Sequence, residues 1–229
     1  MLSNAFYQEH QIIIKAIVAG SGQLFHFIEK GDIDIAITHE PEGEKKLLQK
    51  GSIIARTPLF YSEFFIVGDQ HDPAHVSKAS TTQEAFTQLA KSHSVYISRN
   101  DKSGTHRMEQ RWWPHDTPNM INILRTGTGM GETLNVAAQH NAYTLVDSGT
   151  WLNFNNKKNL KQLWRDTVNL KNHYHLLTLP KPLTSSKNNK HHATTLFSSW
   201  IKSTAAQSII SNYRIDGKRV FTMTETTNF

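Results

Sequence analysis

Short β-rich runs alternate with helical patterns along the 229 residues, and this alternation limits the fold more than any other feature of the sequence. Hydrophobic periodicity and turn residues predict strands at residues 11–18, 33–38, 60–67, 94–98, 121–125, 142–146 and 174–179. The same patterns predict helices at residues 82–91, 105–113, 131–140 and 192–213, the last of them broken near Ser203. Strands that alternate with helices are typical of an α/β protein with mainly parallel sheets.

Two polar stretches divide the chain into candidate lobes. The stretch at 68–73 follows a strong predicted strand, and the stretch at 166–173 precedes the strand predicted at 174–179. If both are crossings, residues 69–172 form an inserted lobe, and residues 1–68 together with 173–229 build the other lobe. We therefore expect a two-lobed protein in which one lobe is discontinuous in sequence.

The amino-acid composition excludes some kinds of chemical site and favours one charge of partner. The chain has no cysteine, which excludes disulfides, thiolate metal sites and a cysteine nucleophile. It has 25 basic and 19 acidic residues and a net charge of +6, a balance that favours anionic partners, from nucleic acid to small oxyanions. No signal peptide is visible before the apolar residues 12–14, so we expect either a cytosolic protein or a leader that lies outside this sequence.

Three glycine-containing turns lie between a predicted strand and a helix: residues 18–23 (VAGSGQ), 98–106 (SRNDKSGTH) and 126–131 (TGTGMG). A strand-to-helix turn leaves backbone N–H groups unpaired at the helix N-terminus, where the macrodipole is positive. Glycine lets an anion approach these groups, and Ser and Thr hydroxyls add donors. Each turn is also explained by a helix start with no ligand. The dinucleotide fingerprint and the P-loop motif are both missing, which disfavours nucleotide binding.

The turn at 98–106 is the most specific of the three. The fork of Arg99, the hydroxyls of Ser103 and Thr105 and the amides of the helix start could converge on one tetrahedral oxyanion. Asp101 either holds Arg99 in position or accepts a proton from a protonated anion. The alternative is a capped helix with Arg99 in a surface ion pair. We favour the anion site.

Five blocks of the sequence, in order and at matching spacing, resemble tungstate-binding proteins of ABC transporters. They are VAGSGQ at 18–23, DIDIAITHEP at 32–41, SRNDKSGTH at 98–106, TGTGMGETLN at 126–135 and AYTLVDSGT at 142–150. The resemblance runs from near residue 1 to at least residue 180. The third block is also similar to that of phosphate-binding proteins, so it does not by itself name the anion.

This resemblance implies a type II periplasmic binding fold with two α/β lobes and a ligand cleft between them. It implies that binding closes the hinge between the lobes. The implied ligand-binding residues are Ser21 and Gly22 from one lobe, and Arg99, Ser103, Gly104, Thr105, Thr128 and Gly129 from the other. Family members begin with a strand that carries a Thr/Ser-rich segment, and we expect this sequence to lack that strand, through truncation or through loss.

The predicted function is a high-affinity tungstate- or molybdate-binding subunit of an ABC importer, located in the periplasm or otherwise outside the cytoplasmic membrane. The expected partners are the oxyanion and the permease. The chain would contact the membrane only through the permease or through an anchor outside this sequence, and we expect no cofactor and no nucleic acid. Two alternatives remain open: a phosphate-binding protein, and a truncated or degenerate ligand-sensing regulatory domain. An enzyme is disfavoured because no nucleophile, base and orienting residue can be named together.

Two other groups of residues have structural and functional interpretations. His173 and His175 alternate on a predicted strand and so face the same side, but no third ligand is identified, and a structural role is favoured over a metal site. Trp112 and Trp113 lie near Arg107 and Arg111, a combination that fits base stacking or the packing of a helix end. We favour packing.

Overall fold

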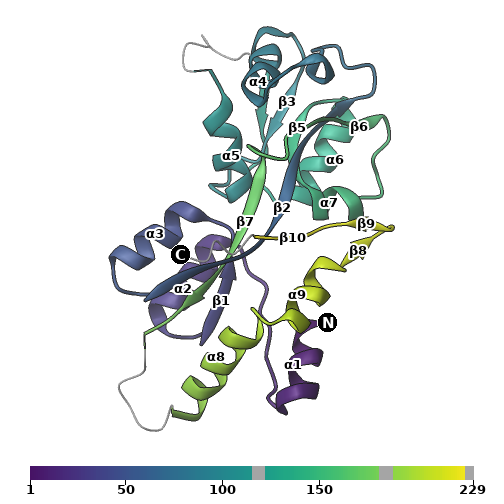
Figure 1. Ribbon diagram of the computed structural model, residues 1–229. Coiled ribbons are helices and arrows are strands. Elements are labelled where there is room, and N and C mark those ends of the chain that lie inside the picture. Colours follow the sequence, from purple (N-terminus) through teal and green to yellow (C-terminus); the bar gives the residue numbers. More distant parts are fainter. Residues whose placement is uncertain (115–121, 181–187, 225–229) are drawn as a thin grey trace. The chain divides into compact units, whose positions relative to one another are not determined.

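The computed structural model describes residues 1–114, 122–180 and 188–224. Its elements in chain order are α1 (Leu2–His10), α2 (Ser21–Lys30), β1 (Ile35–Thr38), α3 (Pro41–Gln49), β2 (Ala55–Asp69), η1 (Val76–Lys78), α4 (Thr82–Lys91), β3 (Tyr96–Ser98), α5 (Gly104–Trp112), β4 (Ile123–Arg125), α6 (Met130–His140), β5 (Thr144–Asp147), α7 (Ser148–Asn153), β6 (Leu160–Arg165), β7 (Lys171–Thr178), α8 (Asn188–Trp200), α9 (Thr204–Ser211), β8 (Arg214–Ile215), β9 (Lys218–Arg219) and β10 (Thr222–Met223) (Figure 1). In the described part of the chain, no helix combines the length and the apolar character needed to cross a membrane.

The chain divides into two compact units, each made of segments distant in sequence. Unit 1 comprises residues Met1–Tyr61, His173–Arg214 and Phe221–Phe229, and unit 2 comprises Ser62–Asn172 and Ile215–Val220. The long strand β2 and the strand β7 each contribute residues to both units (Figure 1).

Unit 1 is a sheet with apolar clusters on both faces. β1 pairs antiparallel with β7, and β10 pairs antiparallel with β2. Leu176 of β7 belongs to a cluster with residues of α1, α8 and α9, whereas its neighbour Leu177 packs with residues of α2 and α3. Because successive side chains of a strand point to opposite faces, the two leucines anchor helices on both sides of the sheet.

Unit 2 repeats this layered arrangement. The second half of β2 pairs antiparallel with β5 and with β6, and β3 pairs in parallel with β4. Phe64 and Ile66 of β2 lie in one buried cluster with Phe86 of α4, while Phe65 lies in the other cluster with Leu134 of α6. The turns that follow β3 and β4 lead directly into α5 and toward α6, and they carry the predicted site residues of unit 2.

The predicted helices are confirmed, including the break near Ser203. Helix α4 has the predicted bounds, and α8 ends at Trp200 before α9 begins at Thr204. Ser203 caps α9, because its hydroxyl oxygen accepts a hydrogen bond from the Ala206 N–H at 3.3 Å.

Two expectations about the strands are wrong. Residues 11–18 form no strand. Ile12 and Ile14 pack on the cluster of α1, α8 and α9, whereas Ile13 is exposed. The alternation of buried and exposed side chains therefore reflects burial of one side of the segment, without a hydrogen-bonded partner strand among the described residues. The sheets are also not mainly parallel. In the described ladders, β3 with β4 is the parallel pair, because the 15-residue strand β2 is long enough to pair antiparallel with strands in both units.

Candidate functional site

The turn between β3 and α5 has a fixed and unusual backbone. Asn100 and Lys102 both have positive φ angles, 48° and 61°, a conformation that non-glycine residues seldom adopt. The Lys102 N–H donates to Nδ1 of His106 at 3.1 Å, and the Ser103 hydroxyl oxygen caps α5 by accepting from the His106 N–H at 3.3 Å. Strained residues of this kind persist where surrounding contacts hold them, and they concentrate at binding sites.

Arg99 projects into this turn with one of its donors unused. Its Nη2 donates to Oδ2 of Asp101 at 2.5 Å and its Nη1 donates to the hydroxyl of Thr105 at 3.4 Å. The Arg99 side chain is 17% exposed, and its Nε–H is buried with no hydrogen-bond partner among the described residues. Because a buried donor without an acceptor costs free energy, this atom marks a place where an acceptor fits.

Asp101 holds Arg99 in position. Burial alone would raise the pKa of Asp101, but hydrogen bonds from Ser103 and the charge of Arg99 outweigh burial and lower that pKa. The Ser103 N–H donates to Oδ1 at 3.1 Å, so both carboxylate oxygens are hydrogen-bonded. Of the two roles predicted for Asp101, the geometry fits the positioning of Arg99.

The turn before α6 is hydrogen-bonded to the turn that carries Arg99. The Gly127 N–H donates to the carbonyl oxygen of Arg99 at 2.8 Å, and Gly127 has a φ of 68° that suits glycine. Gly129 is the N-cap of α6 and provides no side chain to cap it. The hydroxyl of Thr128 is buried without a partner among the described residues. Two neighbouring turns therefore each contain a buried polar atom that the described protein leaves unsatisfied.

The predicted site residues fall in both units. Arg99, Ser103, Gly104, Thr105, Thr128 and Gly129 belong to unit 2, where the contacts above bring their two turns together. Ser21 and Gly22 belong to unit 1 and form the first residues of α2. The α2 N-cap is Gly20, which like Gly129 leaves the helix start without a side-chain cap.

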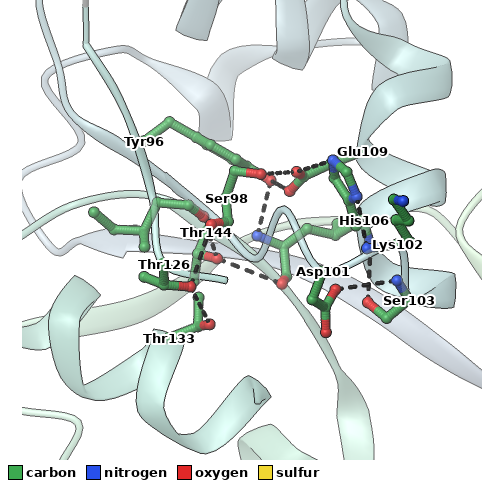
Figure 2. A network of polar contacts seen from close by, with 12 residues as sticks. Tyr96, Ser98, Asp101, Lys102, Ser103, His106, Glu109, Thr126, Thr133 and Thr144 are labelled. Atoms are coloured by element: carbon green, nitrogen blue, oxygen red, sulfur yellow. Dashed lines mark hydrogen bonds and ion pairs between the residues drawn. The ribbon is translucent and has the colours of Figure 1, made fainter. Parts of the chain in front are cut away.

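A buried polar network that no sequence motif predicts is centred on Glu109 of α5 and joins this helix to β3 (Figure 2). Glu109 is 2% exposed, and its carboxyl oxygens accept hydrogen bonds from the hydroxyl of Tyr96, at 2.8 Å, and from the hydroxyl of Ser98. Burial raises the pKa of Glu109 to about 7, although both hydrogen bonds oppose this shift. Spacing was the available signal, because Glu109 follows Thr105 by four residues and so shares its helix face.

Trp113 and His175, two of the residues considered for stacking or metal binding, have protein partners in the structure. Trp113 packs edge-to-face on Phe86 and Tyr96, with ring centroids 4.8 and 4.9 Å away, as expected for a helix end in a core. His175 places Nδ1 3.1 Å from Oε2 of the fully buried Glu44. Within the described ranges, no cluster of three or more His, Asp or Glu side chains is arranged to hold a metal ion.

The chain is similar in sequence and in structure to proteins of one superfamily. The model of the PBP superfamily domain matches residues 3–204. The tungstate-binding protein TupA of Peptoclostridium acidaminophilum is 29% identical over an alignment of 214 residues that covers 91% of this chain and 73% of that protein. The solved structure of the tungstate-binding protein TupA from Desulfovibrio alaskensis G20 has a TM-score of 0.85 and 30% identity, covering 97% of this chain and 91% of its own. A tungstate ABC transporter structure from Geobacter sulfurreducens has a TM-score of 0.79 and 30% identity, covering 93% and 90%.

Proposed function

This chain belongs to the PBP superfamily, and we propose that it is the tungstate- or molybdate-binding subunit of an ABC importer. The named function of its relatives supports the proposal, since proteins similar over most of this chain bind tungstate. In this role the protein catalyses no reaction. It binds a tetrahedral dianion outside the cytoplasmic membrane and delivers it to a permease.

The two unsatisfied donors on adjacent turns of unit 2 carry the proposal. The Nε–H of Arg99 and the hydroxyl of Thr128 are buried, and the turns that hold them are linked by the hydrogen bond from Gly127 to Arg99. The first amides of α5 and α6 have no acceptor within their own helices, and the macrodipoles favour negative charge there. An oxyanion accepts several hydrogen bonds at once and so satisfies such a set of donors.

Tungstate and molybdate differ from phosphate in their protonation state. Tungstate and molybdate only accept hydrogen bonds near neutral pH, whereas hydrogen phosphate also donates one and needs an acceptor. The nearby carboxylate of Asp101 already receives hydrogen bonds on both oxygens, from Arg99 and Ser103. A carboxylate has about four lone-pair sites, so Asp101 could still accept a hydrogen bond from hydrogen phosphate. The preference for tungstate or molybdate over phosphate therefore rests on the relatives that bind tungstate.

Ser21 and Gly22 are included in the proposed site on the strength of the sequence resemblance and the uncapped start of α2. If the Ser21 hydroxyl donates to the anion, Ser21→Ala weakens binding by roughly tenfold, the effect of one hydrogen bond to a charged group. Ser208→Ala is a matched control, because Ser208 is an exposed serine of α9. Equal affinities of the two variants would remove Ser21 from the site.

Isothermal titration calorimetry of the intact chain with sodium tungstate, molybdate, sulfate and phosphate tests the function. We expect one tungstate or molybdate per chain and much weaker binding of phosphate. Absence of binding for both tungstate and molybdate would contradict the proposed function, and preferential binding of phosphate would favour the alternative.

A further inference from the structure

The carboxyl group of Glu109 is connected to both turns of the candidate anion site. It accepts from the hydroxyl of Ser98, the residue immediately before Arg99. The carbonyl oxygen of Ser98 in turn accepts hydrogen bonds from the backbone N–H of Thr126, at 3.0 Å, and from its hydroxyl, at 3.3 Å. Glu109 therefore supports Ser98 at the end of β3 and, through Ser98, Thr126 of the turn before α6 (Figure 2).

The opposite side of the carboxyl group is anchored in the core. Tyr96, which is 2% exposed, donates its hydroxyl hydrogen to Glu109 at 2.8 Å and accepts a hydrogen bond from the Leu145 N–H of β5 at 3.2 Å. Helix α4, which contacts α5, buries Ala85, Phe86 and Leu89 and exposes its charged residues Glu84 and Lys91. The carboxyl group thus has little access to solvent that could screen a change in nearby charge.

The charges that act on Glu109 are those of the anion site. Asp101 raises the pKa of Glu109 and Arg99 lowers it. His106 places Nε2 4.0 Å from a Glu109 oxygen, but its Nδ1 accepts the Lys102 N–H. Burial lowers the pKa of His106, the negative charge of Asp101 opposes this shift, and the positive charges of Arg107, Arg125 and Arg99 add to it.

We propose that Glu109 is a proton-linked positioning residue of the anion site, whose buried carboxyl group takes up a proton when the dianion binds. This inference rests on the proposed function. Without ligand, the charges of Arg99 and Asp101 cancel, whereas a bound dianion leaves a surplus of two negative charges beside the carboxyl group. A negative charge nearby favours the neutral form of a carboxyl group, so binding of the anion and of the proton reinforce each other.

The direction of the pH dependence follows from this coupling. The free protein has a Glu109 pKa of about 7, and the bound dianion raises it further. Affinity is then highest at a pH below the pKa of the free state and declines as the pH rises through the pKa of the bound state. Each unit of increase on binding corresponds to a tenfold decline in affinity across this range.

Calorimetry with sodium tungstate in two buffers of different ionisation enthalpy measures the proton uptake directly. At pH about 7.5, an increase of about one unit in the Glu109 pKa corresponds to uptake of about half a proton per anion. Glu109→Gln removes the titrating group, and we expect it to bind tungstate with uptake near zero and with an affinity that no longer depends on pH. A purely structural role of Glu109 would change affinity without changing the proton count.

His106→Asn is the matched control, because the asparagine oxygen can accept the Lys102 N–H while the titrating ring is removed. We expect this variant to retain the uptake. The inference is overturned if the wild-type chain binds tungstate with no proton uptake, if the uptake persists in Glu109→Gln, or if it disappears in His106→Asn. If Glu109→Gln does not fold, two tests remain: absence of uptake in the wild-type chain, or loss of uptake in His106→Asn, still overturns the inference. Failure of the wild-type chain to bind any anion is a different result and contradicts the proposed function itself.

Discussion

Arg99→Ala is the substitution that best separates an anion site from a capped helix with an ion pair. In the wild-type chain the guanidinium group bonds to Asp101 and Thr105 and retains one buried donor. The substitution removes that donor and the positive charge, and it leaves the Asp101 carboxylate facing the position proposed for the dianion.

The expected loss of affinity can be worked from these contacts. A hydrogen bond to a charged group contributes about 1.5–3 kcal/mol, and Asp101 without its counter-charge adds repulsion of similar sign. A total of at least about 3 kcal/mol corresponds to a roughly 150-fold increase in the Kd for tungstate. By contrast, loss of a partly exposed ion pair in a helix cap costs about 1 kcal/mol of stability or less and leaves anion affinity unchanged.

The assay is calorimetric titration of tungstate into wild type, Arg99→Ala and the control Arg111→Ala. Arg111 lies on the same helix, α5, and is exposed, so its removal changes net charge by the same amount away from the turn. We expect a large loss for Arg99→Ala and a change of less than about threefold for Arg111→Ala. Equal effects of the two substitutions would refute a specific role for Arg99 and indicate non-specific attraction.

Three further substitutions test the fold and the site. Burial alone would raise the pKa of Glu44, but hydrogen bonds, led by that from His175, lower this pKa from 4.5 to about 2. The ionised Glu44 therefore stabilises the fold above pH 4.5, and this contribution is lost as the pH falls toward 2. In urea unfolding, Glu44→Gln should lower the free energy of unfolding by on the order of 3 kcal/mol near neutral pH and make it less dependent on pH in acid. A Cβ on Gly68 would lie 2.4 Å from the ring of the fully buried Tyr143, so Gly68→Ala should lower the free energy of unfolding by about 2 kcal/mol, and an unchanged melting temperature would contradict that packing. Thr128→Val removes a buried hydroxyl without a protein partner, so it should leave thermal stability unchanged or raised while tungstate affinity falls about tenfold; unchanged affinity would place the hydroxyl outside the site.

Local chemistry made the Arg99 turn predictable from sequence. A strand followed by Arg, Asp, Ser, Gly and Thr specifies a capped helix start with convergent donors, and α5 begins at Gly104 with Ser103 as its cap. The break before α9 was predictable for the same reason, because Ser203 is a capping residue.

Features that depend on packing between segments distant in sequence could not be predicted from local sequence patterns. Glu109 is polar in sequence and is buried because α5 lies against β3, which supplies the hydroxyls of Tyr96 and Ser98. The segment at 11–18 has the alternation of a strand, but alternation reports which side chains are buried and says nothing of a pairing partner. Strand β6 was missed because its sequence, LKQLWR, alternates poorly and gains its partner from β2.

The most direct test of the central claim is a crystal structure of the chain grown with sodium tungstate, with the metal located by its anomalous scattering. We expect one tungsten position per chain, with anion oxygens hydrogen-bonded to the Arg99 guanidinium, the N-terminal amides of α5 and the Thr128 hydroxyl. Tungsten bound elsewhere, or no bound tungsten at saturating concentration, would contradict it.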